Sequence, residues 1–169
     1  LWSGAAGESR KKVLKAGAVE HFIKTFPALK KDLEKFGMKY EGSKGDITFP
    51  TALRASKEVL QVLKKHGWDE NYYLEASTII FGYSAVVYEK EMKKADSEME
   101  KSLKEIDANP NIAPEMKKQL KDQLKATRGI LNTQGNVMQK NIHPDDLKLI
   151  TPHLNEIKDM LDRLDKKVK

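Results

Sequence analysis

The sequence predicts an all-α protein, a single-domain bundle of five or six helices with one long central helix. Two observations lead to this prediction. The run from Asp69 to Asp107 contains no proline and a single glycine, Gly82, and its apolar residues recur at helical spacing. In the last segment, residues 147–168, apolar residues alternate at spacings of three and four, which is typical of a helix that packs along one face.

The long helix is predicted over residues 70–106, and its two halves differ. In residues 70–88 apolar side chains occupy two opposite sides, so we expect this half to be buried at the centre of the fold. In residues 89–106 one apolar stripe continues, and the remaining positions mix lysines with acidic residues. A helix with one stripe rests on one partner. We therefore expect an antiparallel hairpin with a helix over residues 114–132.

The N-terminal part is predicted to hold a flexible segment, residues 1–8, before the single domain of residues 9–169. Ser9 is a candidate cap for a first helix over residues 10–24. Pro27 is expected to restart this helix, because proline fits the first turn of a helix.

Residues 38–48 hold glycines and no apolar period, so we expect a loop. Pro50 then opens a helix predicted over residues 50–66. Gly67 is expected to close that helix, and Asp69 to cap the long one.

The helix after Pro114 is expected to bury Met116 and Ile130 against the long helix. Residues 133–143 are predicted to form a second loop. Pro152 falls inside the last apolar repeat, so we expect a break there that keeps the phase of the repeat, with Thr151 as a possible cap. This seam of residues 147–168 can pack within the bundle or pair with another chain, and packing within the bundle is the more common outcome.

The chain is lysine-rich and has a net charge of +6. Arginine, whose forked side chain suits bases and phosphates, supplies only four of the 31 basic residues, and acidic residues are spread throughout. These features do not favour a nucleic-acid partner. The densest basic face lies on the predicted 114–132 helix, and we take it as a candidate interaction face: Lys117, Lys118, Lys121, Lys125 and Arg128.

Chemical motifs are not evident. The chain has no cysteine, and its four histidines show neither the His-Glu-x-x-His nor the Glu-x-x-His spacing. No glycine-rich phosphate loop or nucleophile motif is present. We expect His66 to serve a helix end and His143-Pro144-Asp145-Asp146 to start a helix. The sequence thus predicts no enzyme activity, no cofactor and no metal site, and no apolar run reaches the roughly 20 residues of a transmembrane helix.

An aromatic group surrounds the start of the long helix, and it is the candidate ligand pocket: Trp68, Tyr72, Tyr73, Tyr83 and Tyr88. Several tyrosines on a central helix can line an apolar pocket with polar tips. The same residues can equally be packed core, in which their hydroxyls need partners. The packing spacing favours core.

The order of turn and cap residues resembles that of small exported all-helical bacterial proteins. The shared pieces are Phe26-Pro27, Lys65-His66-Gly67-Trp68, Asn109-Pro110, Pro114-x-x-Lys117-x-x-Leu120, Gly135-Asn136-Val137 and Pro152-His153-Leu154. The resemblance implies signal-directed export and a periplasmic or envelope location, with no catalytic residues. The small residues of Leu1–Gly7 look like the start of a mature protein. A cytoplasmic location is the alternative.

Two functions are therefore expected. A non-catalytic envelope protein would contact a protein partner through the hairpin of residues 89–131 or through the seam of residues 147–168. A carrier would instead enclose a small apolar ligand in the tyrosine-rich centre. The packing spacing of the tyrosines favours the interaction protein.

Overall fold

The structure is a computed structural model, and it describes residues 11–36, 39–41, 46–48 and 56–166. These residues are mostly helical, so the predicted all-α class is confirmed. The predicted flexible segment, residues 1–8, lies outside the described residues, as does Ser9. The chain forms two compact units, one of Leu1–Ser84 with Ile142–Lys169 and the other of Ala85–Asn141.

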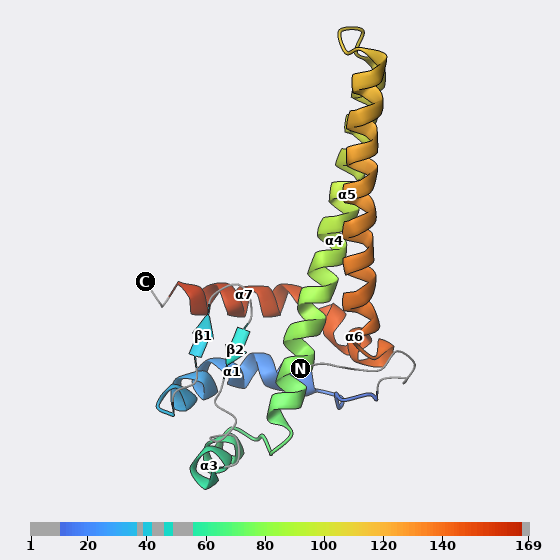
Figure 1. Cartoon of the computed structure of the whole chain (residues 1–169). Helices are drawn as coiled ribbons and strands as arrows, with labels where there is room; N and C mark the ends of the chain where they lie inside the picture. The colour runs from blue at the N-terminus through green and yellow to red at the C-terminus, as the bar shows by residue number, and fades with distance from the viewer. Residues whose placement is uncertain (1–10, 37–38, 42–45, 49–55, 167–169) are drawn as a thin grey trace. The chain divides into compact units, whose positions relative to one another are not determined.

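The described residues of the first unit form helices α1, α3, α6 and α7, which Figure 1 labels, together with a 3-10 turn and the start of α4. Its helical elements are α1 (Ala18–Glu34), α3 (Lys57–Lys65), α6 (Pro144–Ile150), η2 (Thr151–His153) and α7 (Leu154–Asp165). Helix α1 packs against both α3 and α7. Their contact faces are fully buried and apolar: Phe22, Phe26, Leu29 and Leu33 of α1, Val59 and Leu63 of α3, and Ile157 of α7.

Helix α1 begins at Ala18, so the predicted start near residue 10 is wrong. The preceding residues 11–15 are not helical. Gly17 takes a left-handed conformation with φ of 79° just before the helix, which glycine adopts without steric cost. The predicted restart at Pro27 is also wrong, because Pro27 lies inside α1 with its side chain exposed. Phe26 beside it is fully buried, so the proline falls at an exposed position next to the core.

The predicted loop at residues 38–48 contains two short strands, β1 (Lys39–Glu41) and β2 (Asp46–Thr48). They pair antiparallel, with Tyr40 opposite Ile47. Ile47 and Thr48 are β-branched, which favours an extended backbone. The loop prediction is corrected accordingly.

The described helix after the strands begins at Lys57. Ser56 is extended, and its side chain caps the helix by accepting the Val59 N–H at 3.2 Å. The predicted helix start at Pro50 lies outside the described residues. Residues 49–55 lie outside the described part. Gly67 ends this region with φ of 76°, as expected for a glycine stop.

Helix α4 (Tyr72–Ala108) is the predicted long helix, 37 residues in length. The predicted cap is present: the Asp69 Oδ1 accepts the Asn71 N–H at 2.8 Å, and the Asp69 carbonyl accepts the Tyr72 N–H. In this first part of α4, Tyr72, Ala76, Ile79 and Ile80 are buried. Phe81, however, is 40% exposed, so burial on all sides of residues 70–88 is corrected to burial on one broad face.

The C-terminal segment breaks at the predicted proline and keeps its phase. Thr151 does not cap α7, because its Oγ1 donates to the Leu147 carbonyl at 2.7 Å, and His153 takes the cap position. The apolar repeat is buried on both sides of the break: Ile150, Leu154, Ile157, Leu161 and Leu164. The described seam residues are therefore packed within the first unit, so their side chains are not exposed for pairing with another chain. Val168 lies outside the described residues.

The second unit is a hairpin of α4 from Ala85 onward with α5 (Pro114–Lys140), which lie side by side in Figure 1. Contacts run in opposite order along the two helices: Tyr88 bonds Leu131, Asp96 meets Arg128, and Asp107 meets Lys121. The helices are therefore antiparallel. None of the described helices combines the length and apolar content needed to cross a membrane.

Helix α5 extends eight residues beyond its predicted end at residue 132, so the predicted loop at residues 133–143 is largely wrong. Gly135 falls within the predicted loop, yet it lies inside α5. A Cβ at that position would stand 3.3 Å from the Tyr88 ring, so the glycine leaves room for that ring against α5. Three residues then connect α5 to α6.

Candidate functional site

The aromatic residues at the start of α4 form a line of ring contacts. The centroids of His21 and Trp68 lie 4.6 Å apart, those of Trp68 and Tyr72 5.1 Å, and those of Tyr72 and Tyr73 5.4 Å. Edge-on and tilted pairs at these distances are favourable contacts within a core. The Trp68 Nε1–H donates to the Thr25 hydroxyl at 2.8 Å, which links this line to α1.

The structure brings together only part of the predicted ligand pocket. Trp68, Tyr72 and Tyr73 contact one another as a line of rings. Tyr83 is half-buried elsewhere in the first unit. Tyr88 belongs to the second unit, where its hydroxyl donates to the Leu131 carbonyl at 3.2 Å.

Within the line of rings, Tyr72 is fully buried. Burial, and then the neighbouring Tyr73, raises the pKa of its hydroxyl, so Tyr72 stays neutral. Among the described residues the Tyr72 hydroxyl has no hydrogen-bond partner. An unsatisfied buried hydroxyl is a cost that the surrounding ring contacts must offset.

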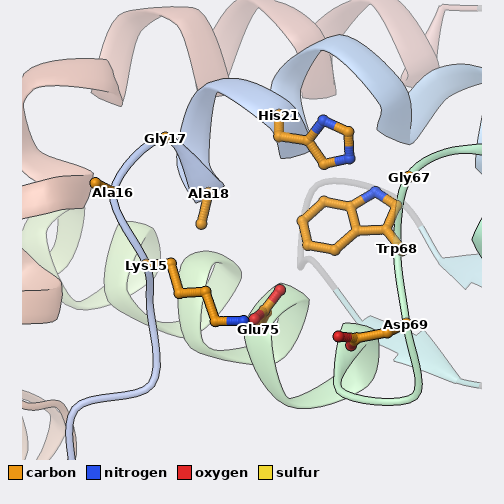
Figure 2. A pocket seen from close by; sticks show the side chains of 9 residues that line it. All are labelled: Lys15, Ala16, Gly17, Ala18, His21, Gly67, Trp68, Asp69 and Glu75. Carbon is orange, nitrogen blue, oxygen red and sulfur yellow. The ribbon is translucent and has the colours of Figure 1, made fainter.

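A cleft of about 220 Å³ opens beside Trp68 in the first unit, as Figure 2 shows. It is lined by Lys15, Ala16, Gly17, Ala18, His21, Gly67, Trp68, Asp69 and Glu75. Trp68 is the one member of the predicted pocket in this lining. Charged side chains face this cleft beside apolar ones, so it is not the apolar pocket that the sequence predicted.

Glu75 is the most strongly perturbed charged group of this cleft. Its side chain is nearly buried. Burial and, after it, the negative charge of Asp69 raise the pKa of the Glu75 carboxyl, while Lys15 and His21 oppose this rise. Figure 2 shows the Lys15 side chain directed at this carboxyl group.

His21 is held against the backbone at Gly67. A Cβ at position 67 would stand 3.0 Å from the imidazole, so a larger residue would require the ring to shift, and the φ of 76° is strained for residues other than glycine. The His21 Nε2 has no hydrogen-bond partner among the described residues. The described lining of this cleft contains no serine, threonine or cysteine side chain beside His21. No set of three or more potential metal ligands gathers in the part of the chain that the structure describes.

The predicted interaction face is partly engaged inside the hairpin. The Lys117 Nζ donates to the Asp107 carbonyl at 2.9 Å, and the Lys121 Nζ donates to the Asp107 carboxylate at 2.8 Å. The Lys121 hydrogen bond and the surrounding lysine charges lower the pKa of Asp107. The Arg128 Nε lies 3.0 Å from the Asp96 carboxylate.

Lys118 and Lys125, the other two members of this face, are exposed. Four of the five predicted residues surround a cleft of about 360 Å³, lined by Asp107, Pro114, Lys117, Lys118, Lys121, Asp122 and Lys125. The two aspartates in the lining offset part of the lysine charge.

The sequence prediction missed an exposed apolar surface on α5. Met116 and Ile130 were expected inside the hairpin, yet they are 53% and 61% exposed, and Val137 is 55% exposed. Their numbers differ by multiples of seven, so they lie along one line of the helix. Apolar spacing along α5 does not determine which side of the helix faces α4, and this is the source of the error. A second signal was available in residues 129–139, which hold no charged side chain in a chain that is 33% charged.

No protein family, curated protein or solved structure matches the chain.

Proposed function

We propose that this protein is a non-catalytic helical bundle that acts by binding a protein in the bacterial envelope. One observation carries the proposal: Met116, Ile130 and Val137 are more than half exposed along one line of α5. Large apolar side chains that gather on a surface mark sites of protein interaction. The envelope location rests on the resemblance of the turn and cap residues to those of exported helical proteins.

The α4–α5 hairpin is favoured over the C-terminal seam as the contact element. The seam residues, such as Ile157 and Leu161, are buried within the first unit. On the hairpin, Lys121 and Arg128 are occupied by the ion pairs with Asp107 and Asp96. Met116, Ile130 and Val137 are exposed instead, so their side chains are not packed between α4 and α5.

The carrier function is supported less well. A carrier of an apolar ligand needs an enclosed apolar cavity. The cleft beside Trp68 is lined by the charged residues Lys15, Asp69 and Glu75 instead.

Site-specific photo-crosslinking in bacterial cells tests the proposal. A photoreactive amino acid at Ile130 should give a covalent adduct with a protein. The same amino acid at Lys125, an exposed position that lies off the apolar line, should give little. An adduct from Lys125 alone would move the contact to the basic face, and no adduct from either position would contradict the interaction function. Cell fractionation against a periplasmic marker tests the location separately.

A further inference from the structure

We infer that the partner of this surface is a second copy of the chain, and that the two α5 helices pair antiparallel about a two-fold axis near Ala126 and Thr127. The inference rests on the proposed function, in which α5 is the contact element. We call the surface the uncharged flank, and its residues are Met116, Gln123, Ala126, Thr127, Ile130 and Val137. All of them are exposed.

Ion pairs between the two helices lie on one side of α5, and the uncharged flank lies on another. On one side the helices are joined by ion pairs, Asp96 with Arg128 and Asp107 with Lys121. At about 100° per residue, Met116 and Ile130 point well away from Arg128 and Lys121 around α5. The uncharged flank therefore lies on a side of α5 that these ion pairs do not cover.

The uncharged flank has the pattern of a helix that packs against another helix. Met116, Gln123, Ile130 and Val137 are spaced by seven residues, as in the seam of a coiled coil. Thr127 already donates its hydroxyl to the Gln123 carbonyl at 3.0 Å, so this hydroxyl needs no partner from outside. The Gln123 side-chain amide is the one strongly polar group of this seam, and a contact has to leave it hydrated or hydrogen-bonded.

The flank is complementary to itself in the antiparallel direction. With the axis between positions 126 and 127, Met116 stands opposite Val137 of the second copy, and Gln123 opposite Ile130 of the second copy. The small side chains of Ala126 and Thr127 then meet at the crossing point, where close approach is needed. A two-fold contact requires this kind of self-matching surface.

Charge supports the same direction. Glu115 begins α5 and Lys140 ends it, and both are exposed. Antiparallel pairing brings the acidic end of each α5 near the basic end of the other, whereas parallel pairing would place like charges together. The antiparallel helix dipoles add to this preference. One chain thus carries both halves of a complementary contact.

Disulfide trapping tests the direction of pairing, because the chain contains no cysteine of its own. Met116→Cys and Val137→Cys are prepared as separate proteins and mixed under mild oxidation. We expect a species of twice the 19.2 kDa chain mass in the mixture and much less with either protein alone. Lys125→Cys mixed with either protein should give little product. Crosslinking within each separate variant, or none in the mixture, would overturn the antiparallel assignment.

Sedimentation of the full chain tests the association itself. We expect the natural sequence to form a dimer. For Ile130→Asp the dissociation constant of the dimer should be at least about tenfold larger than for the natural sequence. Lys125→Asp should leave it nearly unchanged. Circular dichroism verifies that both variants keep their helices, which the exposure of both positions makes the expected result. A monomer at about 100 µM would overturn the second copy as partner. If the chain is a monomer but the photo-crosslink at Ile130 still captures a different protein, the proposed function stands without the dimer. If the photo-crosslink captures nothing, the proposed function and the dimer are both contradicted.

Discussion

The Asp146 carboxylate accepts the backbone N–H of Leu14 at 2.9 Å, across most of the length of the chain. Its other oxygen accepts the N–H of Val13 at the same distance. Asp146 is 1% exposed and lies in the first turn of α6. The Val13 and Leu14 N–H groups thus donate to a buried carboxylate. In a helix they would instead donate to backbone carbonyls. This explains why residues 11–15 run without helix and why α1 begins only at Ala18.

Replacement of Asp146 by alanine should lower the free energy of unfolding by about 2–4 kcal/mol. The reason is the loss of two hydrogen bonds to a charged group, which leaves the Val13 and Leu14 N–H groups without that partner. Urea denaturation measures the change. Asp145→Ala, at an exposed neighbour in the same turn, should cost much less. Equal losses in the two variants would contradict the role assigned to Asp146.

The link between α1 and α3 should make stability depend on pH on the acid side. The His66 Nε2 lies 2.8 Å from the Asp32 carboxylate, and this hydrogen bond, with the charges of Lys65 and Lys35, lowers the pKa of Asp32. A carboxyl whose pKa is lowered by folding contributes stability above its unfolded pKa of about 3.9, and this is lost as the pH falls through its folded pKa.

Asp32→Asn should therefore show a smaller loss of stability than the natural sequence between about pH 5 and pH 3. Thermal unfolding at a series of pH values measures the slope. Asp122→Asn, at an exposed aspartate of the second unit, is the matched control and should keep the natural slope. An unchanged slope in Asp32→Asn would show that the pair with His66 contributes no pH dependence.

Glu75 should have the opposite effect on stability. Burial raises the pKa of its carboxyl, and Asp69 raises it further. A carboxyl whose pKa is higher in the folded state than in the unfolded state destabilises the fold at neutral pH, and this penalty is relieved as the pH falls through the folded pKa. Glu75→Gln should raise the melting temperature at pH 7 and have less effect near pH 4. A lower melting temperature at pH 7 would indicate that the carboxylate has a favourable partner.

The sequence was sufficient for features set by neighbouring residues. The stop at Gly67, the cap at Asp69 and the break at Pro152 follow from local backbone preferences, and the structure has all three. The all-α class follows from the apolar period of α4 and α7 in the same way. Such signals lie within a few positions of the feature that they determine.

Features set by distant contacts could not be predicted in this way. The start of α1 depends on Asp146, whose acidic side chain was expected only to favour the start of α6. Gly135 lies within α5, where the Tyr88 ring packs against it, so the extent of this helix was not apparent from the local sequence. The exposure of Ile130 depends on how α5 is rotated against α4, which periodicity alone does not determine. The exposed apolar line of α5 was missed for this last reason, whereas the cleft beside Trp68 depends on contacts among residues distant in the sequence, such as His21 and Glu75.

Substitution by alanine should have opposite effects on stability at two helical glycines, Gly82 and Gly129. A Cβ at Gly82 would stand 2.4 Å from the Ile150 Cδ1 and 3.2 Å from the Ile142 Cδ1. Ile150 is fully buried, so its side chain has little room to move away. Around Gly129 a Cβ would meet nothing within 4 Å. The close packing of α4 and α6 therefore requires glycine at position 82, whereas the contacts within the hairpin do not require it at position 129.

Gly82→Ala should lower the free energy of unfolding by about 1–2 kcal/mol, because the cost of overpacking exceeds the gain in helix propensity. Gly129→Ala should raise it by about 0.5–1 kcal/mol through helix propensity alone. Chemical denaturation of both variants measures the difference in sign. Ile150→Val, which removes the Cδ1 atom, should cost less in the Gly82→Ala background than in the natural one. If the two costs were equal, the contact between Gly82 and Ile150 would not be what limits the size of residue 82.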